Sequence, residues 1–443
     1  MPVTRWHADL AWIGRPAARV LIESEDERIT AVTPDVDPPA DAVRLAGVTV
    51  PGLANAHGHA FHRALRGRTQ SGAGDFWNWR ESMYAVAERL DPDTYYALAR
   101  ATYAEMVLAG ITAVGEFHYL HHAPGGAPYA DPNAMAHAVV AAAADAGIRL
   151  TLLDTCYLQG DVDGRPLAGT QLRFSDGDAE RWVERADGLV DSPMVRVGAA
   201  IHSVRAVDPA SMRTVAGWAA TRAAPLHVHL SEQRAENGAC RARYGITPTA
   251  LLADAGALGQ RTTAVHATHV EPADIDRLGT SGTSVCLCPT TERDLADGVG
   301  PAARLAAAGS PLCLGSDSQA VIDLWEEARA VELDERLVTE RRGQHRPEDL
   351  LRAATAGGMA ALGWDTGRLQ TGALADFVTL GTDSARLAGV DADSLAAFVV
   401  FAASASDVSS VVVGGRQVVG DGRHLGVPEV ASELAAAIAA LLP

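Results

Sequence analysis

Short runs of apolar and β-branched residues alternate with alanine-rich stretches along most of the chain. Runs that are apolar throughout are typical of parallel strands that are covered on both faces. Eight such strands are predicted, at residues 46–53, 112–117, 149–157, 195–201, 225–230, 262–267, 284–288 and 311–314.

The stretches between these runs predict helices. They lie at residues 92–109, 132–146, 179–189, 209–222, 248–254, 272–278 and 301–308. Several begin with proline in the first turn, and Gly110 and Gly147 stand where a left-handed residue ends a helix. Because strands that alternate with helices pair in parallel, the eight units predict a closed (β/α)₈ barrel of the TIM type over residues 46–362.

Both ends of the chain carry further strand-like runs. These are residues 10–13, 19–22, 376–380, 408–413 and 417–419. Gly414 and Gly415 form a hairpin-turn signal between the last two runs. Segments 1–45 and 363–443 are therefore expected to meet in one small β-sandwich domain, closed by a helix at 428–442.

Composition narrows the class of function. The 443 residues are 48% hydrophobic and carry a net charge of −18, which argues against a nucleic-acid or anionic-membrane surface and favours a small-molecule substrate. No long uncharged apolar run and no signal-peptide core are seen, so a soluble cytoplasmic protein is expected. Five cysteines do not make a disulfide framework, and burial is the favoured interpretation of Cys286 and Cys288 over soft-metal binding.

The chain contains no lysine, so all 37 basic residues are arginines. This excludes Schiff-base and pyridoxal-phosphate chemistry and the lysine-dependent phosphate loop. It also excludes a lysine carbamate bridging two metal ions. If a metal centre exists, one ion is the simpler expectation.

His57 and His59 stand just past the first apolar run. Side chains alternate between faces along an extended segment, so these two point the same way and could hold one metal ion. Chance proximity near a turn is the competing interpretation. The pair alone does not decide between them, because His-x-His is a short pattern.

Other strand ends supply the missing ligands. A barrel carries its active site at the carboxyl ends of its strands. His227 and His229 end the fifth predicted strand, His266 ends the sixth, and Asp317 follows the eighth. Three imidazoles and a carboxylate suit zinc or a similar divalent ion, with room for a bound water. Together these residues predict a metal site.

With these motifs in view, the chain resembles the amidohydrolase superfamily, in its mononuclear deaminase branch. The likeness rests on His57-x-His59, the run from His227 to Glu232, His266 and the Gly-Ser-Asp segment at Asp317, and it covers the whole chain. Segments 76–84, 116–122 and 202–206 are similar to those of N-formimino-L-glutamate deiminases.

The resemblance implies roles for individual residues. His57, His59, His229 and Asp317 would be the metal ligands, with Zn²⁺ the expected ion and Fe²⁺ also compatible. Asp317, His266 and Glu232 would be the catalytic residues, and Glu232 would move the proton. His227 is then expected to support the site or fill the core.

The implied substrate carries two carboxylates, which a planar guanidinium binds through two hydrogen bonds. The matching positions are Arg80, Tyr119, His202 and Arg205. His62 stands where the family has glutamine, and it too is expected to contact substrate. Trp77 and Trp79 flank Arg80 and either pack the loop or touch substrate.

The expected function is the hydrolytic deimination of N-formimino-L-glutamate to N-formyl-L-glutamate and ammonia, a step of histidine degradation. The alternative is another deaminase of the superfamily acting on a purine, pterin or triazine ring, for which an apolar, aromatic-rich pocket is expected. A metal-free binding or scaffold protein on the same barrel is the third hypothesis. The resemblance also implies a homodimer, with no nucleic-acid or membrane partner.

Overall fold

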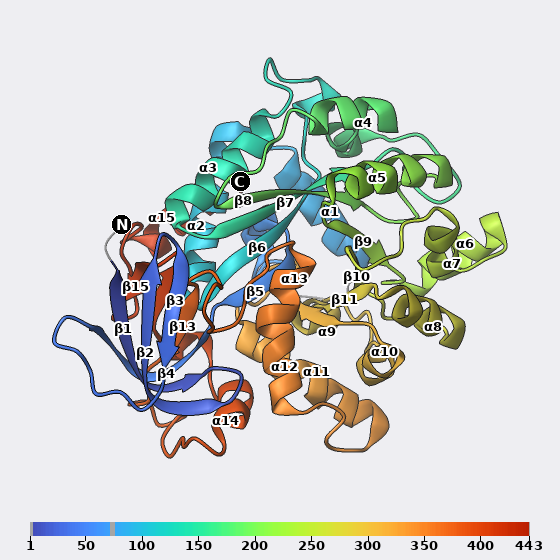
Figure 1. The fold of residues 1–443 in the computed structure, drawn as a ribbon. Coiled ribbons are helices and arrows are strands. Elements are labelled where there is room, and N and C mark those ends of the chain that lie inside the picture. The colour runs from blue at the N-terminus through green and yellow to red at the C-terminus, as the bar shows by residue number, and fades with distance from the viewer. Residues whose placement is uncertain (1–2, 71–75, 443) are drawn as a thin grey trace.

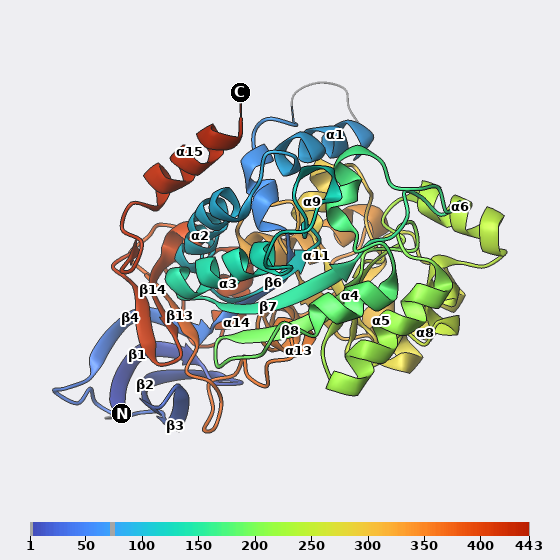
Figure 2. The same ribbon diagram turned by 90° about the horizontal axis from the view of Figure 1, so that it is seen from above.

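The computed structural model describes residues 3–70 and 76–442 of the chain. It consists of a barrel surrounded by helices and a smaller sheet beside it, to which both ends of the chain contribute (Figure 1). The view from above shows the first strands and the last strands of the chain lying together in that sheet (Figure 2). Among the described residues, no helix has the length and apolar character needed to cross a membrane.

The barrel sheet contains eight strands in the described part of the chain, each parallel to its neighbour in sequence order. They are β5 (Leu53–Gly58), β6 (Ile111–His118), β7 (Arg149–Cys156), β8 (Val195–Ile201), β9 (Leu226–Leu230), β10 (Thr262–His266), β11 (Ser284–Leu287) and β12 (Leu312–Leu314). Every residue of β6 and of β7 is buried. The apolar runs of the sequence therefore correspond to strands covered on both faces, and the predicted barrel is confirmed.

Helices follow most barrel strands and cover the outside of the barrel (Figure 1). The α-helices up to β13 are α1 (Phe76–Ala87), α2 (Pro92–Leu108), α3 (Ala134–Ala146), α4 (Ala179–Ala186), α5 (Pro209–Arg222), α6 (Arg234–Tyr244), α7 (Pro248–Asp254), α8 (Pro272–Ser281), α9 (Pro289–Asp294), α10 (Ala302–Ala308), α11 (Leu324–Thr339), α12 (Pro347–Arg352) and α13 (Gly358–Ala361). Shorter turns are η1 (Ala60–Leu65), η2 (Pro124–Gly126), η3 (Gly169–Phe174) and the π-turn η4 (Ala353–Gly357).

Local sequence signals explain where these helices start and stop. Asp91 accepts a hydrogen bond from the Thr94 amide at 2.8 Å, and Pro92 occupies the first turn, so α2 begins there. Gly147 ends α3 in the left-handed conformation, with a φ of 70°. These signals place the helix ends without any tertiary contact.

The small sheet is built from both ends of the chain, as predicted, and its strands form one continuous sheet. Its order is β16-β15-β14-β13-β4-β1-β2-β3. The strands are β1 (Thr4–Trp12), β2 (Pro16–Glu25), β3 (Arg28–Thr33), β4 (Val43–Pro51), β13 (Phe377–Leu380), β14 (Val408–Val413), β15 (Arg416–Gly420) and β16 (Arg423–His424). The remaining elements are α14 (Leu395–Phe401), η5 (Ala405–Asp407) and the closing helix α15 (Val430–Leu441).

The prediction that residues 46–53 form the first barrel strand was wrong. Most of that run belongs to β4, which pairs with β1 and β13 in the small sheet. The chain crosses into the barrel at Gly52, where a side chain would lie 2.2 Å from Thr112 Oγ1. The barrel strand β5 therefore begins at Leu53. The expected division at residues 45 and 46 falls inside β4, and the division into three segments stays a prediction.

Candidate active site

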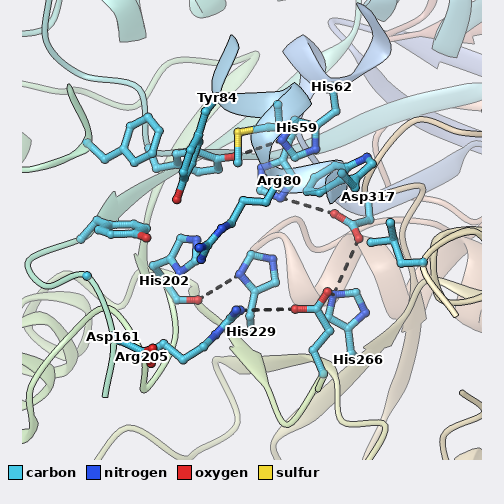
Figure 3. Close-up of a pocket in the computed structure, with 18 residues that line it drawn as sticks. His59, His62, Arg80, Tyr84, Asp161, His202, Arg205, His229, His266 and Asp317 are labelled. Carbon is cyan, nitrogen blue, oxygen red and sulfur yellow. Dashed lines mark hydrogen bonds and ion pairs between the residues drawn. The ribbon is translucent and has the colours of Figure 1, made fainter. Parts of the chain in front are cut away.

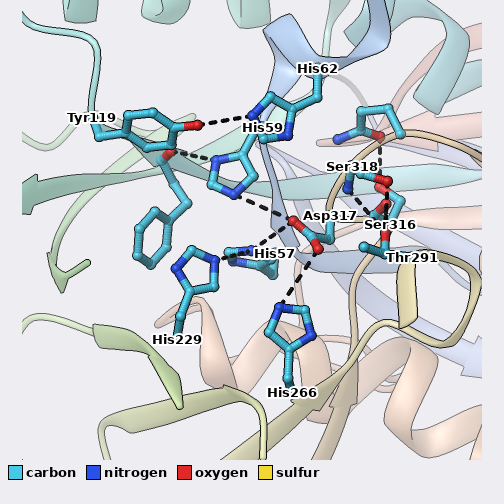
Figure 4. Close-up of polar contacts among 12 residues, drawn as sticks. His57, His59, His62, Tyr119, His229, His266, Thr291, Ser316, Asp317 and Ser318 are labelled. Atoms are coloured by element: carbon cyan, nitrogen blue, oxygen red, sulfur yellow. Dashed lines mark hydrogen bonds and ion pairs between the residues drawn. The ribbon is translucent and has the colours of Figure 1, made fainter. Parts of the chain in front are cut away.

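Four side chains that can ligate metal meet at the carboxyl end of the barrel (Figure 4). His57 lies in β5, His59 follows it, His229 lies in β9 and Asp317 follows β12. One ligand atom of each lies within 4.8 Å of the other three. Asp317 Oδ1 is 3.3 Å from His57 Nε2 and 3.4 Å from His59 Nε2, and the Nε2 atoms of His57 and His229 are 3.1 Å apart.

Backbone carbonyl groups fix the direction of two of these rings. His59 Nδ1 lies 2.9 Å from the Phe117 carbonyl oxygen, and His229 Nδ1 lies 2.9 Å from that of His202. Because a carbonyl oxygen only accepts, each Nδ1 carries the proton. Each Nε2 therefore turns a lone pair toward the cluster, which is the second-sphere pattern of metal-binding histidines.

The electrostatics of the cluster also fit a cation. Burial lowers the pKa of His57, His59 and His229, which keeps the rings neutral and able to ligate. Burial opposes ionisation of Asp317, but the neighbouring histidines lower the pKa of its carboxyl group below the ordinary value. Three neutral imidazoles and one carboxylate on a common centre suit a divalent ion such as zinc.

The backbone around Asp317 is held tightly against β5. The Asp317 amide donates to the His57 carbonyl at 3.0 Å, and the His59 amide donates to the Asp317 carbonyl at 3.2 Å. Asp317 has a φ of 42°, a conformation that costs a non-glycine residue roughly 1–3 kcal/mol and persists only where the surroundings impose it. The same contacts that close the barrel between β12 and β5 therefore position the carboxylate.

His266 and Glu232 lie beside the cluster. His266 Nε2 is 3.7 Å from Asp317 Oδ2 and 4.0 Å from Glu232 Oε1, while its Nδ1 is 3.3 Å from Glu292 Oε1. Burial acts to lower the pKa of His266, but Glu232, Glu292 and Asp317 together raise it to about 10. The three neighbouring carboxyl groups thus favour the protonated form of this ring.

A pocket opens next to these residues (Figure 3). All the residues that the sequence predicts as substrate contacts line it: His62, Arg80, Tyr119, His202 and Arg205. His59, His229, Glu232, His266 and Asp317 also line it. His57 does not, because its side chain is fully buried beneath the others. The predicted residues are thus brought together, whereas their individual roles stay predictions.

Two arginines reach into the pocket from different elements. Arg80, on α1, lies beside His202, with its guanidinium carbon 5.5 Å from the centre of the Tyr84 ring (Figure 3). Arg205 follows β8 and points toward the His266 side of the pocket (Figure 3). The pocket thus contains two guanidinium groups, which can bind carboxylates, beside the acidic residues Asp161, Glu232 and Asp317.

Polar and aromatic side chains form one wall of the pocket. His62 Nε2 lies 2.9 Å from the Tyr119 hydroxyl. Burial lowers the pKa of His62 to about 3, so this ring is neutral. The ring of His202 lies 4.4 Å from that of Tyr157. Trp79 lines the pocket and also packs against the hydrophobic core, so both interpretations of it stay predictions, while the side chain of Trp77 lies outside the described residues.

Some pocket residues were not predicted from the sequence. Gln171 donates to the hydroxyls of Tyr84 and Tyr157 at 3.2 Å each, and both tyrosines line the pocket. Tyr157 directly follows β7, so its position at a strand end was an available signal. Gln171 lies in η3 and has no comparable signal.

His227 lies deeper in the barrel than His229. Its Nε2 is 3.0 Å from the Ala361 carbonyl oxygen, and the side chain is fully buried. Burial lowers the pKa of this ring to about 3. His227 is therefore a neutral core residue, hydrogen-bonded away from the cluster.

Two further groups among the described residues have metal-like geometry. His118, His121 and Asp154 lie close together, but both oxygens of Asp154 accept hydrogen bonds from Arg185 at 2.8 Å. The second group joins Cys288 to His266 and Asp317. Cys288 is buried, and burial raises the pKa of its thiol well above the ordinary value.

Comparisons with known proteins agree with this geometry. The model of the amidohydrolase family matches residues 48–418. Formimidoylglutamate deiminase of Pseudomonas aeruginosa is 38% identical to this chain, and the match covers 91% of each protein. 8-Oxoguanine deaminase of the same organism is 33% identical over 88% of this chain and 85% of the relative.

Solved structures show the same fold. The crystal structure of an amidohydrolase from Brucella melitensis matches with a TM-score of 0.92 and 33% identity, over 99% of this chain and 100% of the other. An adenosine deaminase from Xanthomonas campestris with bound zinc matches with a TM-score of 0.86 and 23% identity, over 99% and 97% of the two chains. Since the family model spans the barrel and much of the small sheet, the chain belongs to the amidohydrolase family.

Proposed function

We propose that this protein hydrolyses N-formimino-L-glutamate to N-formyl-L-glutamate and ammonia, as a step of histidine degradation. The observation that carries the proposal is the pair Arg80 and Arg205, which line the same pocket as the metal-ligand cluster. A substrate with two carboxylates needs two such cations. The relative that is 38% identical, named a formimidoylglutamate deiminase, supports the same substrate.

His57, His59, His229 and Asp317 would hold one divalent metal ion, with zinc the expected ion and iron an alternative. A bound ion supplies Lewis acidity, which lowers the pKa of water toward neutrality and so provides a nucleophile at working pH. The protein's own residues supply the remaining steps. Asp317 turns Oδ2 toward His266, so that oxygen can accept a proton from water.

The reaction adds water across the carbon–nitrogen double bond of the formimino group. Addition places the hydroxyl group on the carbon and one proton of the water on the terminal nitrogen. The second proton then passes from that hydroxyl group to the same nitrogen, the bond from carbon to this nitrogen breaks, and ammonia leaves as the carbonyl of the formyl group forms. Glu232 lines the pocket within 4.0 Å of His266 and is the group proposed to carry the proton. His266 orients or polarises the reacting water.

Arg80 and Arg205 are proposed to bind the two carboxylates of the substrate, and Tyr119 and His202 to contact the remainder. His62 is held beside Tyr119 and presents a neutral ring. A neutral imidazole can donate or accept one hydrogen bond, so His62 helps to set which acidic substrate fits.

Deamination of a ring compound is the second candidate function. Its support is the aromatic lining of the pocket, which includes Trp79, Tyr84, Tyr157 and Phe174, together with the relative named 8-oxoguanine deaminase. It ranks second because a neutral ring offers no partner to two guanidinium groups. A metal-free binding protein ranks third, since the ligand set is complete. A cytoplasmic location and a homodimer stay predictions.

The Arg205→Ala variant tests the carboxylate site. We expect kcat/KM for N-formimino-L-glutamate to fall by roughly a hundredfold or more, because a charge-assisted contact to substrate is lost. Zinc content should stay at the wild-type level. Arg205→Lys keeps a positive charge beside Glu232. It therefore distinguishes loss of the two-hydrogen-bond contact that a guanidinium group makes from a defect in folding. Unchanged kinetics of both variants would remove Arg205 from the substrate site.

A further inference from the structure

Glu236 is a buried carboxylate that the proposed mechanism does not use. It lies in the first turn of α6, and its side chain is 0% exposed. Its Oε1 accepts a hydrogen bond from the Ser231 amide at 2.8 Å. Ser231 has a φ of 49° and directly precedes Glu232. Glu236 therefore fixes the strained turn that carries the proposed proton-transfer group.

The other oxygen of Glu236 faces Arg205. Arg205 Nε lies 2.9 Å from Glu236 Oε2, whereas the NH2 group of Arg205 lies 3.4 Å from Glu232 Oε2. This contact is a close ion pair between a largely buried guanidinium group and a fully buried carboxylate. Arg205 is thus held between two carboxylates, of which Glu236 is the nearer and the more buried.

We propose that Glu236 is a positioning residue that orients Arg205 for a carboxylate of the substrate and keeps it from pairing fully with Glu232. This inference rests on the proposed function. A single fully buried anion serves both sides of the site, because one oxygen holds the turn before Glu232 and the other holds the guanidinium group. Fixing a charged side chain in advance lowers the cost of binding a substrate to it.

The arrangement has a consequence for catalysis. Without the charge of Glu236, the nearest anion to Arg205 is Glu232, at 3.4 Å. Arg205 would then turn toward the proton-transfer group and away from the substrate. The loss should appear first in binding of the acidic substrate, because the proton-transfer residue itself is still present.

Glu236→Gln is the direct test. The amide oxygen of glutamine can still accept the Ser231 amide, so the turn before Glu232 is kept while the anionic oxygen that faces Arg205 is replaced by an uncharged amide nitrogen. In the zinc-loaded enzyme, KM for N-formimino-L-glutamate should rise roughly tenfold to a hundredfold, with kcat changed by less than about threefold. The matched control is Glu332→Gln, which alters a buried glutamate that also holds an arginine, Arg336, and accepts backbone amides, but lies on α11 away from the pocket.

Combining the variants separates positioning from a general structural defect. If Glu236 acts through Arg205, the effects of Glu236→Gln and Arg205→Ala on KM should be far less than additive. A general defect would instead lower kcat/KM on every substrate, including an N-alkylformamidine that lacks carboxylates. Additive effects, or equal losses on amidines with and without carboxylates, would overturn the proposal.

A crystal structure of the Glu236→Gln variant keeps the inference testable even if the substrate is different. In that structure we expect Arg205 to move toward Glu232 or to lose a single orientation. A separate assay of the wild-type enzyme shows whether N-formimino-L-glutamate is turned over. Failure of wild type to react overturns the proposed function, whereas an unmoved Arg205 overturns the role of Glu236. If Glu236→Gln does not fold, Glu236→Asp retains the charge one methylene further from Arg205 and is expected to raise KM by a smaller factor.

Discussion

Glu116 is a fully buried carboxyl group near the carboxyl end of β6. Both of its oxygens lie 3.0 Å from the amide of Ala60, the residue after His59. They also accept the hydroxyls of Tyr95 and Tyr103 at 2.9 Å each. This one residue therefore anchors the turn that follows the first pair of candidate metal ligands.

Glu116 should make stability depend on pH. Burial raises the pKa of its carboxyl group to about 7, although its hydrogen bonds to Ala60, Tyr103 and Tyr95 act to lower it. Since the folded pKa is above the unfolded one, the stabilisation is fully present below about pH 4.5 and is lost as the pH rises through about 7.

Urea unfolding of the zinc-loaded protein can measure this effect. Between about pH 5 and about pH 8, the free energy of unfolding of wild type should fall by roughly 1–3 kcal/mol more than that of Glu116→Gln. Because metal binding varies with pH in the same way for both proteins, the difference isolates Glu116. Parallel profiles for the two proteins would show that Glu116 does not titrate in this range.

At the residue level, the sequence could predict where a side chain lies when its residue stands at the end of a strand, whereas its role stays a prediction. His57, His59 and Glu232 could be placed because the carboxyl ends of parallel strands share one face of a barrel. Gln171 and Glu236 could not, because each lies on a short turn or helix. Their contacts depend on how η3 and α6 pack, and no local sequence pattern predicts that packing.

Closure of the barrel between β12 and β5 depends on a close approach at Gly315. A side chain there would lie 2.7 Å from the His57 carbonyl oxygen and 2.9 Å from His57 Cβ. Gly315→Ala should therefore push β12 from β5 and displace Asp317. We expect the free energy of unfolding to fall by about 1–3 kcal/mol and zinc affinity to fall at least about tenfold.

Gly217→Ala is the matched control for Gly315→Ala. Gly217 is exposed within α5 and has open space around its Cα, so alanine should leave zinc affinity unchanged and stabilise the helix by up to about 1 kcal/mol. Chemical unfolding and metal titration of both variants measure the two effects. Equal zinc affinity of Gly315→Ala and wild type would contradict the role given to the β12–β5 contact.

Among helices and strands, the sequence predicted the boundaries that depend on local signals. Helices α5 and α7 begin at Pro209 and Pro248, as expected from proline in the first turn. Helix α11 was not predicted, although Asp323 caps it by accepting the amides of Trp325 and Glu326. The end of β4 could not be predicted, because the crossing at Gly52 depends on contact with Thr112.

A buried ion pair joins the barrel to the small sheet. Arg149, on β7, donates from Nε to Asp376 Oδ2 at 2.7 Å and from Nη2 to Oδ1 at 3.2 Å, and both side chains are 0% exposed. Asp376 also accepts the Gly414 amide at 2.7 Å. The two residues of the pair lie 227 positions apart, so no sequence pattern predicts their contact.

Asp376→Ala should destabilise the whole molecule by about 3–5 kcal/mol, because the buried guanidinium group loses its nearest anion and keeps only Glu27, at 3.5 Å. The variant should still bind zinc when folded, since it leaves the ligand cluster intact. Asp41→Ala, which breaks the exposed pair with Arg5, is the control and should cost less than about 1 kcal/mol. Similar unfolding midpoints for the two variants would contradict this account.

The whole-molecule arrangement was predictable because alternation of strands and helices over a long segment leaves few alternatives to a barrel. The meeting of the chain ends followed from strand signals at both termini, with Gly414 and Gly415 turning between β14 and β15. The substrate pocket is harder to foresee, since it combines two arginines with an aromatic wall contributed by several loops.

The most direct test of the central claim is a comparison of kcat/KM for ammonia release by the zinc-loaded protein. The substrates are N-formimino-L-glutamate, N-formimino-L-aspartate, guanine, 8-oxoguanine and adenosine, with chelator-treated protein as the control. We predict that N-formimino-L-glutamate is preferred over every ring compound by roughly a thousandfold or more, because buried cationic groups discriminate strongly against substrates that leave them unpaired. Higher kcat/KM on any of the ring compounds would contradict the proposed function.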